Sequence, residues 1–107
     1  MPYTTFIGYP STPGARFDLK YYIEVHFPLV EKHWGHLGIE SWNVVSFIGD
    51  DKAPYIVVAE TVWRDVEAAT KAFTPGLILA EIVGDVPNFT DLKAVSFSGE
   101  QVATSKL

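Results

Sequence analysis

The chain has 107 residues, of which 48% are hydrophobic and 14% aromatic, and a formal net charge of −5 at pH 7. This length predicts a single domain over residues 1–107, and the acidic balance without clustered lysine or arginine excludes nucleic acid as an expected partner. Cysteine is absent, which excludes disulfides, a thiolate nucleophile and cysteine-based metal sites. No segment resembles a signal peptide or a membrane span, so we expect a cytoplasmic protein without a membrane partner.

The first half of the chain predicts a strand followed by a long helix. Residues 3–9 are rich in β-branched and aromatic side chains and lead into a proline- and glycine-rich loop, "YPSTPG". Asp18 has the position of a helix N-cap, with Phe17 and Tyr22 spaced as a hydrophobic staple. The helix is predicted to extend over residues 19–34 and to end at Gly35.

The second half predicts a hairpin, two short helices and a last strand. Turn residues 50–54 separate two strand-like segments that should pair, and Asp65 has the position of a second N-cap. A further helix is expected to have Pro75 at its first position, where the missing N–H costs nothing. The expected elements are strands at 39–49, 55–64 and 91–99 and helices at 66–73 and 76–83, followed by a frayed tail.

The resulting order, β-α-β-β-α-β, predicts an α+β fold of the ferredoxin-like type. In this fold a four-stranded antiparallel sheet carries both helices on one face. The strand patterns leave apolar residues on both faces of that sheet, for example Val57 and Ala59 on one side and Val58 and Val62 on the other. Since an antiparallel sheet with one wet face alternates apolar and polar residues, we expect the second face to be buried in a homodimer.

The first helix carries the most informative side chain, His26. An apolar stripe of Leu19, Ile23, Phe27, Val30 and Trp34 runs along this helix, and His26 lies at its border, on a face shared with Tyr22. A half-buried histidine without a partner has a lowered pKa and stays neutral, as a general base must. Pro28 cannot donate to the carbonyl of Glu24, so the helix should kink or widen just after His26.

Several of these residues also have a purely structural interpretation. His26 and Tyr22 could be ordinary core residues, and the three tryptophans could line a ligand cavity or simply fill the core. A metal site built from His26, His33 and His36 is disfavoured, because no carboxylate is placed beside them and the last two flank the end of the helix. No phosphate-binding loop, nucleophile elbow or NAD or ATP motif is present.

The stretch "YPSTPGARFDLKYYIEVHFPLVEKHWGHLGIESWNVV" resembles the EthD family, and "DVPNFTD" resembles that family's C-terminal segment. The resemblance covers most of residues 3–98. It implies a dimeric α+β barrel with a pocket between the sheet and the helices of each subunit. Related barrels act without metal or organic cofactor as monooxygenases, isomerases, dehydratases or cyclases on aromatic or polyketide-like molecules, and others bind haem. The family histidine corresponds to His26, and the tyrosine one turn earlier to Tyr22.

The resulting hypothesis is a cofactor-independent oxidoreductase or lyase for a hydrophobic, aromatic or polyketide-type molecule. His26 would act as general acid or base, while Tyr22 would bind a developing oxyanion or orient the imidazole. Two alternatives stay open, namely a non-catalytic binding or accessory protein and a haem-binding barrel. The candidate substrate-binding residues are Phe27, Trp34, Trp42, Trp63 and Phe73.

Overall fold

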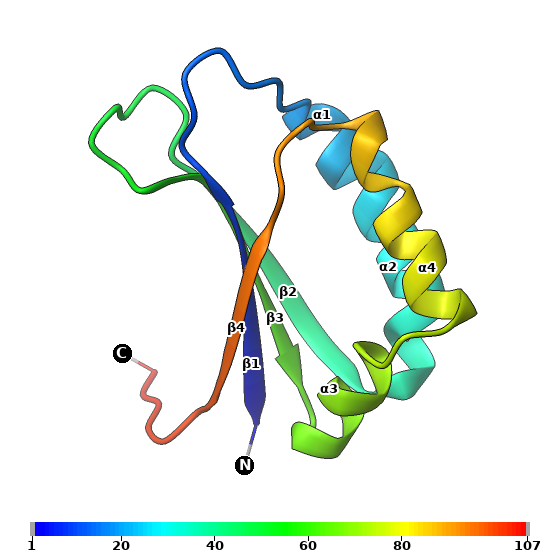
Figure 1. The fold of residues 1–107 in the computed structure, drawn as a ribbon. Coiled ribbons are helices and arrows are strands. Elements are labelled where there is room, and N and C mark those ends of the chain that lie inside the picture. Colours follow the sequence, from blue (N-terminus) through cyan, green and yellow to red (C-terminus); the bar gives the residue numbers. More distant parts are fainter. Residues whose placement is uncertain (1, 107) are drawn as a thin grey trace.

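The computed structural model describes residues 2–106, in the order expected from the sequence. Figure 1 shows a four-stranded sheet with helices packed along one side. The strands are β1 (Tyr3–Pro10), β2 (Ile39–Ser46), β3 (Tyr55–Trp63) and β4 (Val95–Glu100). The α-helices are α1 (Leu19–Tyr21), α2 (Phe27–Trp34), α3 (Val66–Ala72) and α4 (Leu77–Gly84). A π-helical turn, η1 (Tyr22–His26), joins α1 to α2, and η2 (Gly35–Leu37) and η3 (Val86–Asn88) are 3₁₀ turns.

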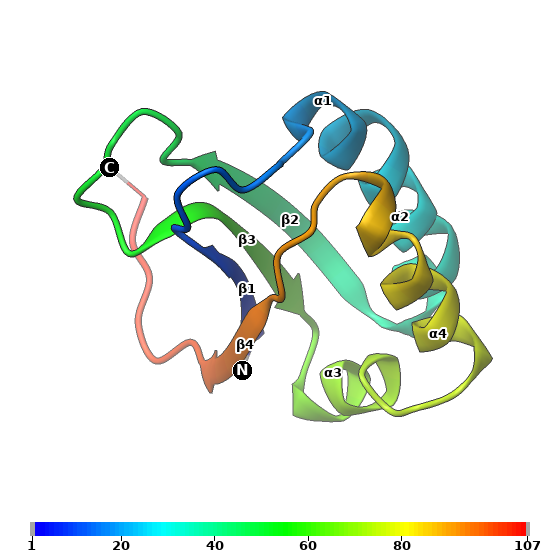
Figure 2. The same cartoon turned by 45° about the horizontal axis from the view of Figure 1, so that its top comes forward.

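The sheet order is β2-β3-β1-β4, and every neighbouring pair is antiparallel. This is the ferredoxin-like arrangement, with both helical segments on one face, as Figure 2 shows from a second direction. The predicted α+β fold class and the β2–β3 hairpin are therefore confirmed. Among residues 2–106, no helix has the length and apolar character that crossing a membrane requires.

The first helix begins as the sequence predicts. The Asp18 carboxylate accepts a hydrogen bond from the Tyr21 backbone N–H at 3.0 Å, and the Phe17 and Tyr22 rings meet edge to face with centroids 5.1 Å apart. These two contacts confirm the N-cap and the staple. The helix then widens at η1, where the Phe27 N–H donates to the Tyr22 carbonyl in a bond that spans five residues.

The widening lies before Pro28, whereas the sequence pattern placed it just after His26. Pro28 lies in the first turn of α2, a position that tolerates a proline although it has no N–H to donate. The wide turn also changes which residues face the core. Ile23, assigned to the apolar stripe, is exposed, whereas Tyr22 and His26 are buried.

Three predicted boundaries in the second half were wrong. Pro75 lies outside α4, because Gly76 is the N-cap and the helix begins at Leu77. Strand β2 ends at Ser46, since Gly49 with a φ of 99° belongs to the following turn. Strand β4 begins only at Val95, after a loop in which Thr90 bridges to Phe17. That bridge ties the loop after α4 to the start of the first helix.

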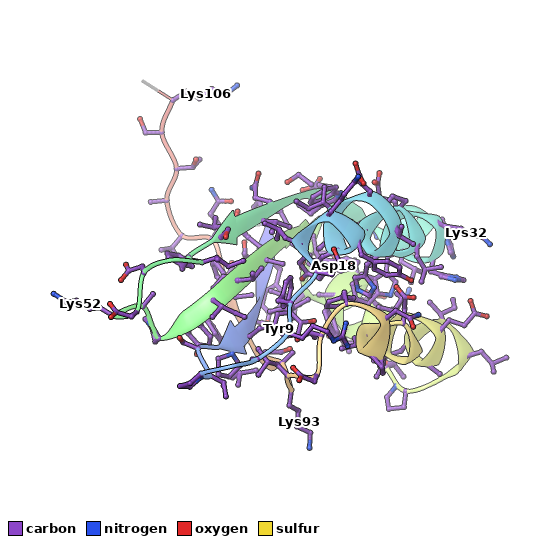
Figure 3. The ribbon with its side chains drawn as sticks, turned by 90° about the horizontal axis from the view of Figure 1, so that it is seen from above. Tyr9, Asp18, Lys32, Lys52, Lys93 and Lys106 are labelled. Atoms are coloured by element: carbon purple, nitrogen blue, oxygen red, sulfur yellow. The ribbon has the colours of Figure 1, made fainter. Side chains whose placement is uncertain are left out.

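The core fills the space between the sheet and the helices. Val57, Ala59, Thr61 and Trp63 point inward from β3, and α3 packs close to the sheet through three buried alanines: Ala68, Ala69 and Ala72. In Figure 3, Tyr9 lies between the sheet and the helices, while the labelled lysines point outward. The opposite face of the sheet is apolar and has no cover within residues 2–106, with the Phe6 and Phe97 rings stacked on it at 5.4 Å.

Candidate functional site

A cavity of about 220 Å³ lies between the inner face of the sheet and the helices. The first helix, the sheet, α4 and the loops beside them each supply part of its wall. The lining residues are Ile7, Tyr9, Tyr22, His26, Phe27, Val30, Trp34, Thr61, Phe73, Leu79, Ile82, Val83, Val86, Ala94 and Ser96. None of these is a lysine, an arginine or a carboxylate, so His26 is the titratable group in this wall that can take up a proton near neutral pH.

His26 is buried, and Asp85 holds one of its two ring nitrogens. The His26 Nδ1 lies 2.9 Å from Asp85 Oδ2, across the interface between the first helix and the end of α4. An ionised carboxylate only accepts hydrogen bonds, so Nδ1 carries the proton and donates it. With Nδ1 paired, Nε2 is the nitrogen of His26 left for a ligand in the cavity.

Burial lowers the pKa of His26 below its ordinary 6.5, although the hydrogen bond and the charge of Asp85 act in the opposite direction. The desolvation of the imidazolium is the larger effect. The imidazole is therefore neutral at pH 7, with an unprotonated Nε2. This is the state in which a histidine can accept a proton from a bound molecule.

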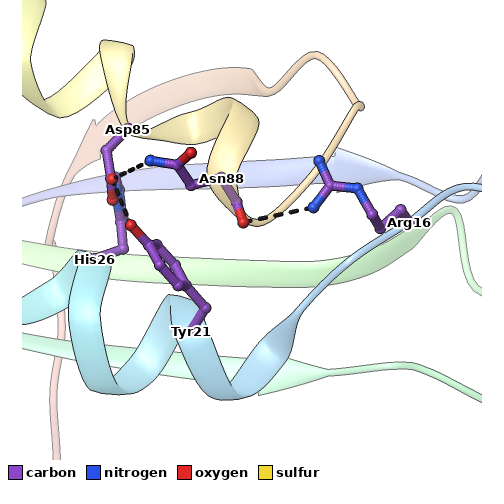
Figure 4. Close-up of polar contacts among 5 residues, drawn as sticks. All are labelled: Arg16, Tyr21, His26, Asp85 and Asn88. Atoms are coloured by element: carbon purple, nitrogen blue, oxygen red, sulfur yellow. Dashed lines mark hydrogen bonds and ion pairs between the residues drawn. The ribbon is translucent and has the colours of Figure 1, made fainter.

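Asp85 is held by three donors from two parts of the chain. Its Oδ1 accepts from the Tyr21 hydroxyl at 2.7 Å and from the Asn88 amide at 2.9 Å, and its Oδ2 accepts from His26 (Figure 4). Burial by itself raises the pKa of Asp85, but the hydrogen bonds from Asn88, His26 and Tyr21 together outweigh burial and leave the pKa below 3.8. The carboxylate thus stays ionised at neutral pH.

The turn that carries Asp85 and Asn88 is anchored to the loop before the first helix. The Arg16 guanidinium donates to the carbonyl of Pro87 at 2.6 Å, and the Arg16 backbone N–H donates to the Asp91 carboxylate at 3.1 Å. The Phe89 carbonyl in turn accepts from the Asp18 N–H at 2.7 Å. These contacts bring the two chain segments together so that Asp85 reaches His26.

Tyr22 lies against the face of the His26 ring, with centroids 5.4 Å apart and the planes 14° from parallel. It contacts the imidazole through its ring, and the residue that hydrogen-bonds to the imidazole is Asp85. Burial, together with the neighbouring Tyr9, raises the pKa of Tyr22 well above 10. The phenol is thus a neutral hydrogen-bond donor in the cavity wall at physiological pH.

The five predicted wall residues divide into two groups. Phe27, Trp34 and Phe73 line the cavity, whereas Trp42 and Trp63 lie outside it. Trp42 stacks on Phe27 with centroids 4.3 Å apart. Trp63 is completely buried beside Trp34 and donates from its indole nitrogen to the Thr61 hydroxyl at 3.0 Å. These two tryptophans support the wall from behind.

His33 and His36 do not join His26 in a cluster. His33 Nε2 of α2 lies 2.7 Å from Glu81 Oε2 of α4, but the geometry is not that of a hydrogen bond. His36 is exposed. Within residues 2–106, no group of three or more histidine, cysteine or acidic side chains is arranged to hold a metal ion.

Asp85, Tyr21 and Asn88 were not among the site residues predicted from the sequence. Two signals pointed to them: the segment "DVPNFTD" resembles the C-terminal segment of the EthD family, and the paired tyrosines 21 and 22 lie next to a predicted irregularity. A wide turn shifts the register of a helix, so either tyrosine of the pair could have faced the histidine region.

Comparisons with known proteins agree with this fold. Residues 15–93 match the EthD domain. The chain is similar to the crystal structure of an EthD-like protein from Ralstonia eutropha JMP134, with 26% identity and a TM-score of 0.84 over 97% of this chain and 95% of that one. The chain is also similar to an EthD family protein from Bacillus halodurans C-125, with 18% identity and a TM-score of 0.69 over 95% of this chain and 100% of that one.

A more distant structure shows the same fold. SnoaB, a cofactor-independent oxygenase from Streptomyces nogalater, aligns at 12% identity and a TM-score of 0.58 over 96% of this chain and 93% of SnoaB. No curated protein sequence matches the chain significantly.

Proposed function

Since the chain belongs to the EthD family, we propose that it is a cofactor-independent enzyme that acts on a hydrophobic small molecule of aromatic or polyketide type. The reaction would be that of an oxidoreductase or of a lyase such as a dehydratase. One observation carries the proposal: His26 lines an otherwise uncharged cavity, and Asp85 holds its Nδ1 so that Nε2 is free to act as a base.

The proposed first step is removal of a proton from an activated C–H or O–H group of the substrate. The proton moves to His26 Nε2, and the electron pair stays on the substrate as an enolate or phenolate. The Asp85 carboxylate would stabilise the imidazolium that forms, and the neutral Tyr22 phenol would donate a hydrogen bond to the new oxyanion. The anion would then either react with O₂ or expel a leaving group.

The chemistry of the wall supports a neutral, apolar substrate. Aromatic rings and aliphatic side chains form most of the surface, and no lysine or arginine is among the lining residues to pair with a phosphate or carboxylate. The fold is compatible with such a reaction, because SnoaB, which shares only the fold, is a cofactor-independent oxygenase.

Deuterium exchange into 2-tetralone tests the proposed base directly. This neutral bicyclic ketone has an activated benzylic CH₂ group, and its exchange in D₂O can be followed by NMR without assuming the later step. We expect exchange to be catalysed by the protein and to fall by ~10²- to 10⁴-fold in His26→Gln. The control is His36→Gln, since His36 is exposed and lies outside the cavity.

The Asp85→Asn variant keeps the His26 imidazole but should catalyse deuterium exchange into 2-tetralone much more slowly than the unaltered protein. The amide can donate to Nδ1, which would place the proton on Nε2 and leave no base in the cavity. Binding of 2-tetralone without any exchange by the unaltered protein would favour the binding or accessory role instead. A Soret band after haem addition would favour the haem-binding alternative.

We also propose that two copies pack through the uncovered face of the sheet. On that face β4 contributes Val95 and Phe97, each close to half exposed, beside Phe6 of β1. Neighbouring residues of β2 and β3 extend the apolar area, interrupted by Glu60, which accepts a hydrogen bond from Asn43 at 3.3 Å. Face-to-face packing would remove this surface from water.

A further inference from the structure

Two side chains of the first helix bind the same carboxylate although they are five residues apart. The Tyr21 hydroxyl donates to Asp85 Oδ1 at 2.7 Å, and His26 Nδ1 donates to Oδ2 at 2.9 Å. Figure 4 shows both pointing from this helix toward Asp85 at the end of α4. Convergence of this kind requires Tyr21 and His26 to lie on one face of the helix.

An ordinary α-helix would not allow it. At 3.6 residues per turn, side chains five residues apart are separated by about 140° around the helix axis. The π turn Tyr22–His26 begins directly after Tyr21 and ends at His26, and it contains one residue more per hydrogen-bonded ring. The wider turn brings residues at i and i+5 toward the same side, and Pro28, which has no N–H to pair, lies two residues after the turn.

We propose that Tyr21 is a positioning residue for His26 and that the π turn is the element that makes this possible. The inference rests on the proposed function of His26 as a base. Tyr21 and Asn88 together occupy Oδ1 of Asp85, which leaves Oδ2 directed at His26. The carboxylate then has one orientation, and the His26 proton is held on Nδ1.

The same contacts could serve only to attach α4 to the first helix. A purely structural role predicts that loss of the Tyr21 hydroxyl lowers the stability of the protein but leaves the tautomer of His26 unchanged in the molecules that remain folded. A positioning role predicts a change at the imidazole itself. The two roles therefore differ in the tautomer of His26 and in kcat, each measured in protein that is fully folded.

The test is an NMR measurement of the His26 tautomer in ¹⁵N-histidine-labelled protein. The chain has three histidines, and the variants His33→Gln and His36→Gln assign the spectra. We expect a single Nδ1–H tautomer in the unaltered protein and a mixture with Nε2–H in Tyr21→Phe. The matched control Tyr55→Phe should keep the single tautomer, because Tyr55 packs over Gly8 and is not one of the donors to Asp85.

Turnover gives the second measurement. With 2-tetralone as the probe, Tyr21→Phe should lower kcat for exchange by up to about 100-fold with little change in KM, because a misplaced base slows the chemical step.

The inference is overturned if folded Tyr21→Phe keeps the single Nδ1–H tautomer and the original kcat. Failure of the proposed function looks different: the unaltered protein would show the Nδ1–H tautomer, lose it in Tyr21→Phe, and still not exchange 2-tetralone. A mixture of tautomers already present in the unaltered protein would also contradict the positioning role.

Discussion

At the scale of single residues, the site depends on a balance between burial and hydrogen bonding at His26 and Asp85. Burial disfavours the charged form of each side chain. At Asp85 the three hydrogen-bond donors outweigh the effect of burial, and the carboxylate stays charged. At His26 the single carboxylate of Asp85 does not outweigh the effect of burial, and the imidazole stays neutral. The pair therefore combines a fixed anion with an unprotonated base at neutral pH.

This balance predicts how stability changes with pH. The native pKa of His26 lies below 6.5, so the unfolded chain binds a proton first as the pH falls. The free energy of unfolding should thus be highest above pH 6.5 and decrease between pH 6.5 and the lower native pKa. Urea denaturation at pH 8, 6 and 5 measures this decrease, which should be smaller in His26→Gln.

The contribution of Asp85 belongs to a more acidic range. Its native pKa is lowered below 3.8, so the stability that it provides is present above that value and is lost only as the pH falls further. If the free energy of unfolding decreases equally between pH 6.5 and 5 in the unaltered protein and in His26→Gln, a group other than His26 causes the decrease.

At the scale of elements, the turn from α2 into β2 depends on Gly38. Its φ is 113°, and a Cβ built on it would lie 2.8 Å from the Cβ of Ala68 in α3. The close approach lets α3 pack beside the turn, and the Gly38 carbonyl accepts from the Arg64 N–H at 2.9 Å. A side chain here would meet both backbone strain and a rigid neighbour.

Gly38→Ala should therefore be more destabilising than Gly49→Ala. Gly49 also has a positive φ, 99°, but nothing lies within 4 Å of its added Cβ. Both variants pay about 1–2 kcal/mol of backbone strain, and Gly38→Ala should lose roughly a further 1–3 kcal/mol by overpacking against α3. Equal losses in chemical denaturation would contradict the packing argument.

At the scale of the whole molecule, the sheet has one face covered by helices and one apolar face without cover in the described residues. Phe97 is 48% exposed on that second face, although it stacks on Phe6. Fully burying an exposed phenylalanine contributes about 1.5–3 kcal/mol, of which Phe97 has roughly half still to gain, and a symmetric interface would count each such residue twice. This gain supports the proposal that two copies of the chain form a homodimer through this face.

Phe97→Lys should convert the proposed dimer to a monomer. Sedimentation should give twice 11.9 kDa for the unaltered protein and 11.9 kDa for the variant at micromolar concentration. The control is Leu77→Lys, at a position 85% exposed in α4, on the helical side of the sheet, where the dimer should persist. A stable 11.9 kDa monomer of the unaltered chain would refute the proposal.

Local sequence patterns were sufficient for the fold. The strands rich in β-branched and aromatic residues, the Asp18 cap, the Phe17–Tyr22 staple and the turn before Tyr55 each depend on a few neighbouring residues, and all are present in the structure. His26 and three of the five candidate wall residues also lie at the cavity: Phe27 and Trp34 from the first helix and Phe73 from the end of α3.

Only the tertiary structure decided the partner of His26. Asp85 is 59 residues away in the sequence, and it reaches the imidazole because the loop after α4 is anchored to Arg16 and Asp18. The sequence pattern predicted Tyr22 as the tyrosine that orients His26, but it is Tyr21 that hydrogen-bonds to Asp85, the partner of His26. This difference follows from the π turn, whose register no 3.6-residue pattern describes. The sequence by itself determined the elements and the histidine, because these depend on neighbouring residues; the carboxylate and the tyrosine depend on how distant elements pack, and that is a property of the folded chain.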